Sequence, residues 1–122
     1  MGRDRADIFQ NAISYIKANL YKNISCQDIA DYCYVSISGL QKDFQRFAGC
    51  GAKAFYLRMK LEEGKRLLIK GKSVSAIAQE MHFSSTPHFS MAFKKQFGIS
   101  PSQYKKMFGG SVKKQIVRMQ DQ

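Results

Sequence analysis

The stretch "SSTPHFSMAFKKQFGISP", residues 84 to 101, contains two prolines, an adjacent lysine pair and three phenylalanines spaced four residues apart. This spacing predicts one helix whose apolar stripe faces the core. Ser85 or Thr86 can cap the helix, because the first proline then falls in the first turn, where its missing N–H removes no hydrogen bond. The buried stripe would be Phe89, Phe93 and Phe97. The opposite face would present Pro87, His88, Met91, Lys94 and Lys95.

The plan of this segment occurs twice in the chain. "IAD" at 29 to 31 matches "IAQ" at 77 to 79 at an offset of 48. The later apolar and glycine positions match at an offset of 49, pairing Leu40, Phe44 and Gly49 with Phe89, Phe93 and Gly98. The repeat therefore has one extra residue in its second turn. Each copy has two short helices joined by a few residues, which are the dimensions of a helix-turn-helix.

Helical periodicity extends over most of the chain, and no run alternates with a period of two. The expected class is all-α, with about seven helices and two helix-turn-helix subdomains joined by a long central helix. The expected bounds are a first helix at about 4–21, a first helix-turn-helix at about 25–49, a linking helix at about 52–70, a second helix-turn-helix at about 73–98, a final helix at about 101–107 and a frayed or linker-like tail at 109–122. Phe47 is expected to face inward beside Leu40 and Phe44. Gly64, inside the linking helix, indicates a close approach by another backbone.

The charge is unevenly distributed. Residues 1 to 50 contain six Lys/Arg against five Asp, whereas residues 51 to 122 contain fourteen Lys/Arg against four acidic residues, within a net charge of +11. Such a basic surface favours a polyanionic partner. The alternative interpretation is a lysine surface that only keeps the protein in solution. A length of 122 residues is sufficient for one domain with its own core.

Enzyme and metal chemistry are not indicated by the sequence. It contains no P-loop, GxSxG or HExxH motif, and no constellation of a nucleophile with an acid or base. Cys26, Cys33 and Cys50 form no CxxC pair, and two histidines complete no metal-ligand pattern, so no metal or cofactor is expected. No signal peptide and no apolar run near 18 residues is present, which favours a cytoplasmic protein without a membrane partner.

The outward faces of the two second helices are candidate DNA-reading surfaces. In the first copy this face consists of Ser38, Gln41, Lys42 and Gln45. Glutamine can pair with adenine, and lysine can bind guanine or phosphate. A linking helix over 52–70 would rise about 28 Å, and major-groove faces recur about every 34 Å. Two recognition helices could therefore lie in adjacent major-groove segments of double-stranded DNA without dimerisation.

Residues 73 to 106 resemble the signature of the AraC/XylS family of bacterial transcription regulators. The shared features are the "IA" pair at 77 and 78, Phe83, Phe89, "FKK" at 93 to 95, Gly98, "SP" at 100 and 101, and Tyr104. The linking segment is similar too, with an aromatic residue at Phe55, "KL" at 60 and 61, and "LL" at 67 and 68.

The resemblance implies that the third and sixth helices enter the major groove. By position, base or groove contacts would come from Ser38, Gln41, Lys42, Thr86, Pro87, His88 and Met91. Phosphate contacts would come from the helix starts at Ser36 and Ser85 and from Arg46, Lys94 and Lys95. The resemblance also implies transcriptional activation through RNA polymerase, and a sensor or receiver domain in the full-length protein. Met1 is then either the start of a free-standing regulator or that of an excised C-terminal domain, which we favour.

Three positions depart from the family pattern. His82 stands where glycine is usual in the second turn, and Tyr34 is its first-copy equivalent, so we expect the second turn to differ in shape. Gly64 stands where alanine is common. Pro87 and Met91 replace hydrogen-bonding residues, which predicts apolar contact with thymine methyl groups and weaker base reading by that helix.

Two other functions are compatible with parts of the sequence. One is a helical protein-interaction module whose basic face binds an acidic partner. The other is the DNA-binding half of a methyl-transfer repair enzyme, which would require a cluster of cysteine ligands that the three cysteines here do not form. For His88, an exposed first-turn residue after proline, DNA contact is favoured over a merely solvated side chain, and metal binding is disfavoured because no partner ligand is visible.

Overall fold

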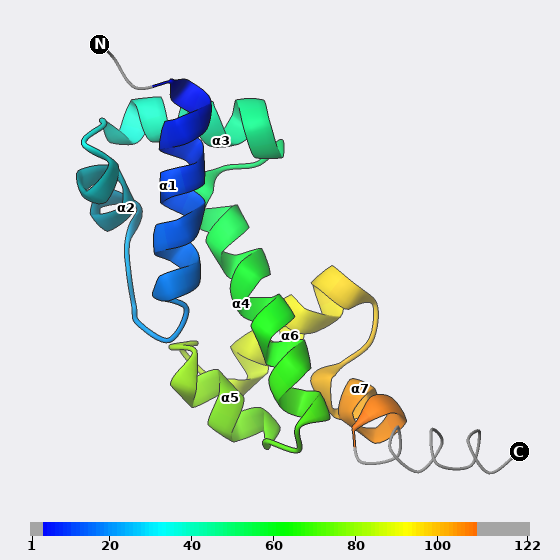
Figure 1. Cartoon of the computed structure of the whole chain (residues 1–122). Coiled ribbons are helices and arrows are strands. Elements are labelled where there is room, and N and C mark those ends of the chain that lie inside the picture. Colours follow the sequence, from blue (N-terminus) through cyan, green and yellow to red (C-terminus); the bar gives the residue numbers. More distant parts are fainter. Residues whose placement is uncertain (1–3, 110–122) are drawn as a thin grey trace, which may run out of the picture. The chain divides into compact units, whose positions relative to one another are not determined.

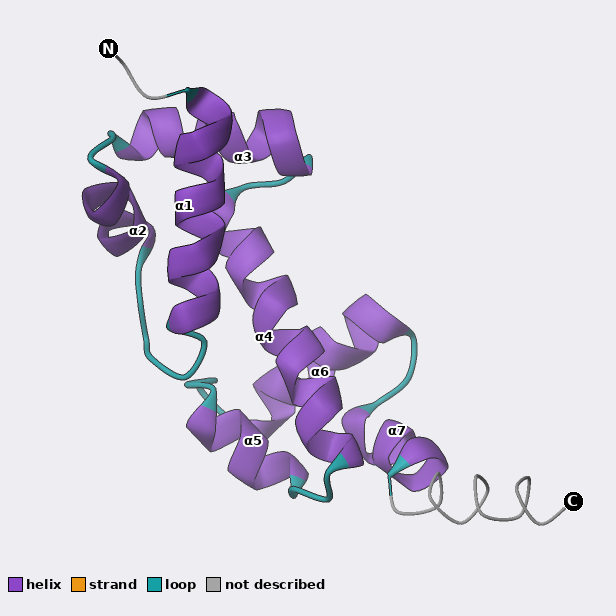
Figure 2. Ribbon diagram, in the orientation of Figure 1, coloured by secondary structure: helices purple, strands orange, loops and turns teal. Residues whose placement is uncertain are grey.

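The computed structural model describes residues 4–109, and this part of the chain is helical throughout, with connecting loops and no strand (Figures 1 and 2). The helices are α1 (Arg5–Ala18), α2 (Cys26–Cys33), α3 (Ile37–Ala48), α4 (Ala52–Ile69), α5 (Val74–Glu80), α6 (Thr86–Phe97) and α7 (Pro101–Phe108). The predicted all-α class with seven helices is therefore confirmed. The predicted frayed tail falls, beyond Gly109, outside the described residues.

The chain divides into two compact units, with the boundary inside α4 after Lys60. The first unit contains α1, the helix pair α2–α3 and the start of α4. The second contains the rest of α4, the helix pair α5–α6 and α7. Each unit thus holds one helix-turn-helix, as the repeat in the sequence predicts.

The core of the first unit is formed by α1, α2, α3 and the first turns of α4. The Phe44 ring lies 4.9 Å from that of Phe9 and 5.3 Å from that of Phe55, in edge-to-face geometry. Burying a phenylalanine side chain contributes about 1.5–3 kcal/mol, so these rings account for much of the unit's stability. α1 ends at Ala18 with Asn19 as its C-cap, earlier than the predicted end near Tyr21.

One buried carboxylate in this core was not indicated by the apolar pattern. Asp43 lies on the inward face of α3 and is 4% exposed. Arg5 donates to both of its oxygens, from Nε at 3.1 Å and from a terminal guanidinium nitrogen at 2.7 Å. This two-point ion pair fixes the start of α1 to the middle of α3.

The prediction for Phe47 was wrong. Its side chain is 40% exposed, although it shares a helix face with Leu40 and Phe44. Phe47 is one residue from the end of α3, where its ring is covered by Phe9 at 5.2 Å and flanked by the Arg46 guanidinium at 5.3 Å. The residue therefore lies at the edge of the core.

The core of the second unit is a chain of aromatic contacts. Phe89 and Phe93 are fully buried, and their ring centroids lie 5.8 Å apart. Phe93 also contacts Phe97 at 4.6 Å and Tyr104 of α7 at 5.7 Å. Of the predicted buried stripe of α6, Phe89 and Phe93 are therefore in the core, whereas Phe97, the last residue of the helix, is only half-buried.

Gly64 was predicted to meet another backbone, and this prediction was wrong. A Cβ atom at this position would lie 3.2 Å from two ring atoms of Phe89 and 3.7 Å from Ile77. The glycine therefore makes room for a buried aromatic ring of α6.

The turns of the two helix-turn-helix motifs share one backbone conformation. Tyr34 and His82 are both left-handed, with φ of 57° and 60°. In each turn the next residue donates to the carbonyl five positions earlier: Val35 to Ala30 at 3.0 Å, and Phe83 to Ala78 at 2.9 Å. The predicted difference in shape is therefore absent at His82. The extra residue of the second turn is Ser84, between Phe83 and the cap of α6.

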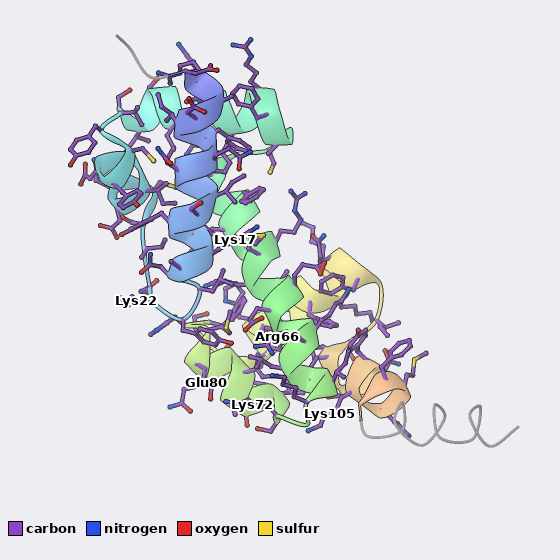
Figure 3. All side chains as sticks on the ribbon, viewed as in Figure 1. Lys17, Lys22, Arg66, Lys72, Glu80 and Lys105 are labelled. Atoms are coloured by element: carbon purple, nitrogen blue, oxygen red, sulfur yellow. The ribbon has the colours of Figure 1, made fainter. Side chains whose placement is uncertain are left out.

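The loop between α4 and α5 is fixed by charged side chains of its own unit. Lys72 forms an ion pair with Glu80, at the far end of α5. Lys105 of α7 donates to the carbonyl of Gly71 at 3.2 Å. These three charged side chains are labelled in Figure 3. This ion pair and this hydrogen bond lie at the surface and stabilise the start of the second helix-turn-helix.

Candidate nucleic-acid interface

The second helices of the two helix-turn-helix motifs, α3 and α6, both begin at a capping serine. Ser36 Oγ accepts a hydrogen bond from the Gly39 N–H at 3.0 Å, and Ser85 Oγ accepts one from the His88 N–H at 3.1 Å. Of the two predicted caps for α6, the structure therefore selects Ser85. Each hydroxyl retains its proton for donation, and a helix N-terminus attracts anions. Both helix starts are suited to bind a phosphate group.

The exposed face of α3 is polar and basic. We call it the α3 surface, and its exposed members are Ser36, Ser38, Lys42, Gln45 and Arg46. The single acidic residue of this helix is Asp43, which is buried and paired with Arg5. No carboxylate of α3 therefore opposes the approach of a polyanion to this face.

Gln41, the residue that the sequence favoured for adenine contact, has a different environment. Its side chain is half-buried. The side-chain oxygen accepts a hydrogen bond from the Ala52 N–H at 3.0 Å, and the amide nitrogen lies 3.8 Å from Cys26 Sγ. Gln41 thus supplies a hydrogen-bond acceptor for the first N–H of α4, which has no partner within its own helix.

The exposed face of α6 combines apolar and basic groups. We call it the α6 surface, and its exposed members are Pro87, His88, Met91, Lys94 and Lys95. Met91 is 73% exposed, as expected for a side chain available to thymine methyl groups. Thr86 is half-buried. No acidic residue occurs in this helix.

The two surfaces differ in chemistry at matching positions. Counted from the caps Ser36 and Ser85, Gln45 and Arg46 of α3 match the two lysines of α6. Lys42 matches Met91, and Gly39 matches His88. Each surface therefore has basic groups near the C-terminus of its helix, Arg46 on α3 and Lys94 and Lys95 on α6. The groups nearer the N-termini, Gly39 and Lys42 of α3 against His88 and Met91 of α6, differ.

His88 has two contacts that the sequence did not reveal. Its Nδ1 lies 3.0 Å from Ser84 Oγ, and its ring lies edge-on to the Phe83 ring with centroids 5.5 Å apart. The one-residue difference between the repeats indicated an insertion here. It did not indicate that the inserted residue contacts the recognition helix.

Two titratable groups with shifted pKa values lie on α4, outside these surfaces. Burial lowers the pKa of Lys60, whose side-chain nitrogen lies 4.9 Å from the centre of the Tyr56 ring. Burial also raises the pKa of Tyr56, whose hydroxyl donates to the Lys22 carbonyl. Both groups belong to the first unit and serve its packing.

The described part of the chain offers no site for metal chemistry. Between residues 4 and 109, no group of three or more His, Cys, Asp or Glu side chains is placed to hold a metal ion. Cys26, Cys33 and Cys50 are present as thiols. Among the described helices, none combines the length and apolar character needed to cross a membrane.

Comparison with known proteins identifies the fold. Residues 29–107 match the model of a helix-turn-helix domain family. A crystal structure of an AraC-type DNA-binding domain protein from Chromobacterium violaceum is 30% identical. It covers 86% of this chain and 95% of its own, with a TM-score of 0.82.

Curated regulators show the same relationship in sequence. The HTH-type transcriptional regulator GbdR of Pseudomonas aeruginosa is 33% identical over 93 residues, which are 75% of this chain and 25% of that protein. The lactose operon transcription activator of Staphylococcus xylosus is 30% identical over 100 residues, 81% of this chain and 36% of that protein. The chain thus spans about a quarter to a third of the length of these two relatives. With a helix-turn-helix family match over residues 29–107 and 30% identity to the AraC-type protein of C. violaceum, the chain belongs to the AraC/XylS family of helix-turn-helix transcriptional regulators.

Proposed function

We propose that the chain binds double-stranded DNA in a sequence-specific manner and regulates bacterial transcription. The observation that carries this proposal is the pair of capped helices with exposed basic faces. Lys42 and Arg46 on α3, and Lys94 and Lys95 on α6, are all exposed, and neither helix exposes a carboxylate. A face of this kind attracts the phosphate backbone of any duplex.

Positioning and specificity would be divided between different residues. Arg46, Lys94, Lys95 and the capped starts at Ser36 and Ser85 would bind phosphate groups, which set the register of the protein on DNA. Ser38, Lys42, Gln45, Thr86, Pro87, His88 and Met91 would lie against base edges. Gln41 would contribute by fixing the start of α4 beside α3, and any base contact would require release of its bond to Ala52.

The presence of two recognition helices in one chain supports a site that spans two segments of the major groove. Each unit of the chain contributes one of these helices, α3 in the first and α6 in the second. Major-groove segments recur along one face of a duplex about every 34 Å. One chain would then read an asymmetric site of somewhat under two helical turns.

The wider role follows from the relatives. The S. xylosus protein is named as an activator, so we propose activation, with RNA polymerase as a protein partner. A sensor or receiver domain would supply the signal in the full-length protein. Such a regulator would act in the cytoplasm, where bacterial DNA is located.

The test compares a base-reading with a phosphate-binding substitution. Duplexes are selected from a random library, and affinities are measured for the best duplex and its single-base variants. Lys42→Ala should flatten the preference at one or two positions by about 1–3 kcal/mol, whereas Lys95→Ala should weaken all duplexes to a similar degree. Lys70→Ala, which removes an exposed charge outside α3 and α6, is the matched control. Equal losses on every duplex for Lys42→Ala and Lys95→Ala would contradict base reading by α3.

A further inference from the structure

The residue inserted in the second turn contacts a side chain of the α6 surface. Ser84 Oγ and His88 Nδ1 lie 3.0 Å apart, so the hydroxyl and the imidazole are hydrogen-bonded. The Phe83 ring meets the His88 ring edge-on, with an interplanar angle of 72°. Phe83 is itself buried. An exposed histidine ordinarily samples several rotamers, whereas this ring is held by one polar and one aromatic contact.

The first helix-turn-helix has no equivalent arrangement. The position matching His88 is Gly39, which has no side chain, and the Arg5 guanidinium lies against it, 3.5 Å from its carbonyl oxygen. The first turn also lacks the inserted residue, because Val35 is followed directly by the cap Ser36. The held histidine and the residue that holds it therefore occur together, in the second motif alone within residues 4–109.

The contact with Ser84 leaves the other ring nitrogen for a ligand. No hydrogen bond within the described part of the chain involves His88 Nε2, and the residue is exposed. In two of the three proton states of an imidazole, Nε2 has a hydrogen and is a donor. The serine hydroxyl can donate to Nδ1 or accept from it, so the contact is compatible with all three states. When Ser84 donates to Nδ1 of the neutral ring, the ring proton is on Nε2, and His88 presents a donor to an acceptor of the ligand.

The major groove offers acceptors at the positions a helix N-terminus can reach. Purine N7 is an acceptor in both adenine and guanine, and guanine adds O6. His88 is the third residue of α6, and the N-terminal residues of a recognition helix are those that contact base edges. A held Nε2–H would also supply the hydrogen bond that Pro87 and Met91 cannot.

We propose that Ser84 is a positioning residue that, together with Phe83, holds the His88 ring so that Nε2–H donates to the N7 of one purine in the DNA site. The inference rests on the proposed function, since it names one atom recognised by the same α6 surface. Specificity at that base pair would depend on a residue in the turn, outside the recognition helix.

The experiment uses the best duplex recovered by selection from a random library. Each purine is replaced in turn by its 7-deaza analogue, which lacks only the N7 acceptor. The wild-type protein should lose about five- to tenfold in affinity at one purine, the range expected for one hydrogen bond. His88→Ala should show no loss at that purine. Ser84→Ala should reduce the loss to about twofold, and Ser84→Thr, which restores the hydroxyl, should recover it.

The controls separate positioning from folding and from the proposed function itself. Ser102→Ala, at an exposed serine of α7, should behave as the wild type. The ¹⁵N shifts of the His88 ring should change in Ser84→Ala and return in Ser84→Thr, while those of His82 stay constant. A full 7-deaza effect in Ser84→Ala would overturn the role of Ser84. A purine effect that survives His88→Ala, or none at any purine, would overturn the N7 contact. Failure to recover any duplex would overturn the proposed function as well.

Discussion

Gln41 lies on a recognition helix, yet its side chain is bonded within the protein. Its oxygen accepts from the Ala52 N–H at 3.0 Å, and a cap of this kind stabilises a helix start by about 1 kcal/mol. We expect Gln41→Ala to lower the free energy of unfolding by about that amount and to weaken binding to all duplexes similarly.

Chemical denaturation and a panel of single-base duplex variants would test this expectation. Gln41→Glu retains an acceptor at the same position and should retain most of the stability. A change in base preference for Gln41→Ala without loss of stability would instead support the base contact that the sequence favoured.

Lys60 is a buried lysine, 7% exposed, whose pKa is lowered from 10.5 by desolvation. Between the lowered pKa and 10.5, the folded state binds fewer protons than the unfolded state. The free energy of unfolding therefore rises with pH in that window, and the desolvation cost is fully present below it.

Replacing Lys60 by methionine removes this pH dependence. The stability of Lys60→Met relative to the wild type should be highest near neutral pH and should fall as pH approaches the usual lysine range. Urea unfolding at several pH values would measure the difference. Lys53→Met, at an exposed position of the same helix, should show no such trend, and a flat difference for Lys60→Met would exclude the desolvation cost.

At the scale of the elements, the turn of each helix-turn-helix contains a residue in the left-handed conformation, followed by the serine that caps the next helix. His82 has a φ of 60°, a conformation that costs a non-glycine residue about 1–2 kcal/mol. Glycine adopts it freely but loses more backbone entropy on folding. We expect His82→Gly to raise the free energy of unfolding by about 1 kcal/mol.

Thermal and urea unfolding would measure that change. His82→Ala keeps the left-handed cost and should bring no gain, while Tyr34→Gly, at a φ of 57°, should repeat the gain in the first motif. A loss of stability for His82→Gly would mean that the imidazole makes contacts worth more than the backbone strain.

At the scale of the whole molecule, the charge of +11 should appear in the salt dependence of binding. Three exposed cationic side chains, Arg46, Lys94 and Lys95, and two capped helix starts would meet about five phosphates, which predicts a slope of log K against log salt of about −4.5. Lys95→Ala should reduce the slope by about 1. Mobility shift of random genomic duplex at several salt concentrations would provide the data. A slope near zero, or no shift at moderate salt, would favour the protein-interaction module.

Most helices and their starts were determined locally and could be predicted from the sequence, although α1 ends at Ala18 and not near Tyr21. Four-residue spacing of Phe89, Phe93 and Phe97 fixed the buried face of α6, because residues on one helix face are neighbours whatever surrounds them. The capping serines were also predictable, because a cap bonds to an N–H only a few residues further along the chain. The two-fold repeat could be read directly from the matching residues of the two copies. Family membership followed from these motifs, and the comparisons confirmed it.

The tertiary structure alone decided which side chains are free to meet a ligand. Gln41 and Lys42 are neighbours in sequence, yet the first is bonded to Ala52 and the second is exposed. The Arg5–Asp43 pair and the Phe89 ring at Gly64 likewise join residues far apart in the chain. Periodicity gives the face of a helix on which a residue lies. It cannot give the atoms that another segment brings to that face, because those depend on how the chain folds back on itself.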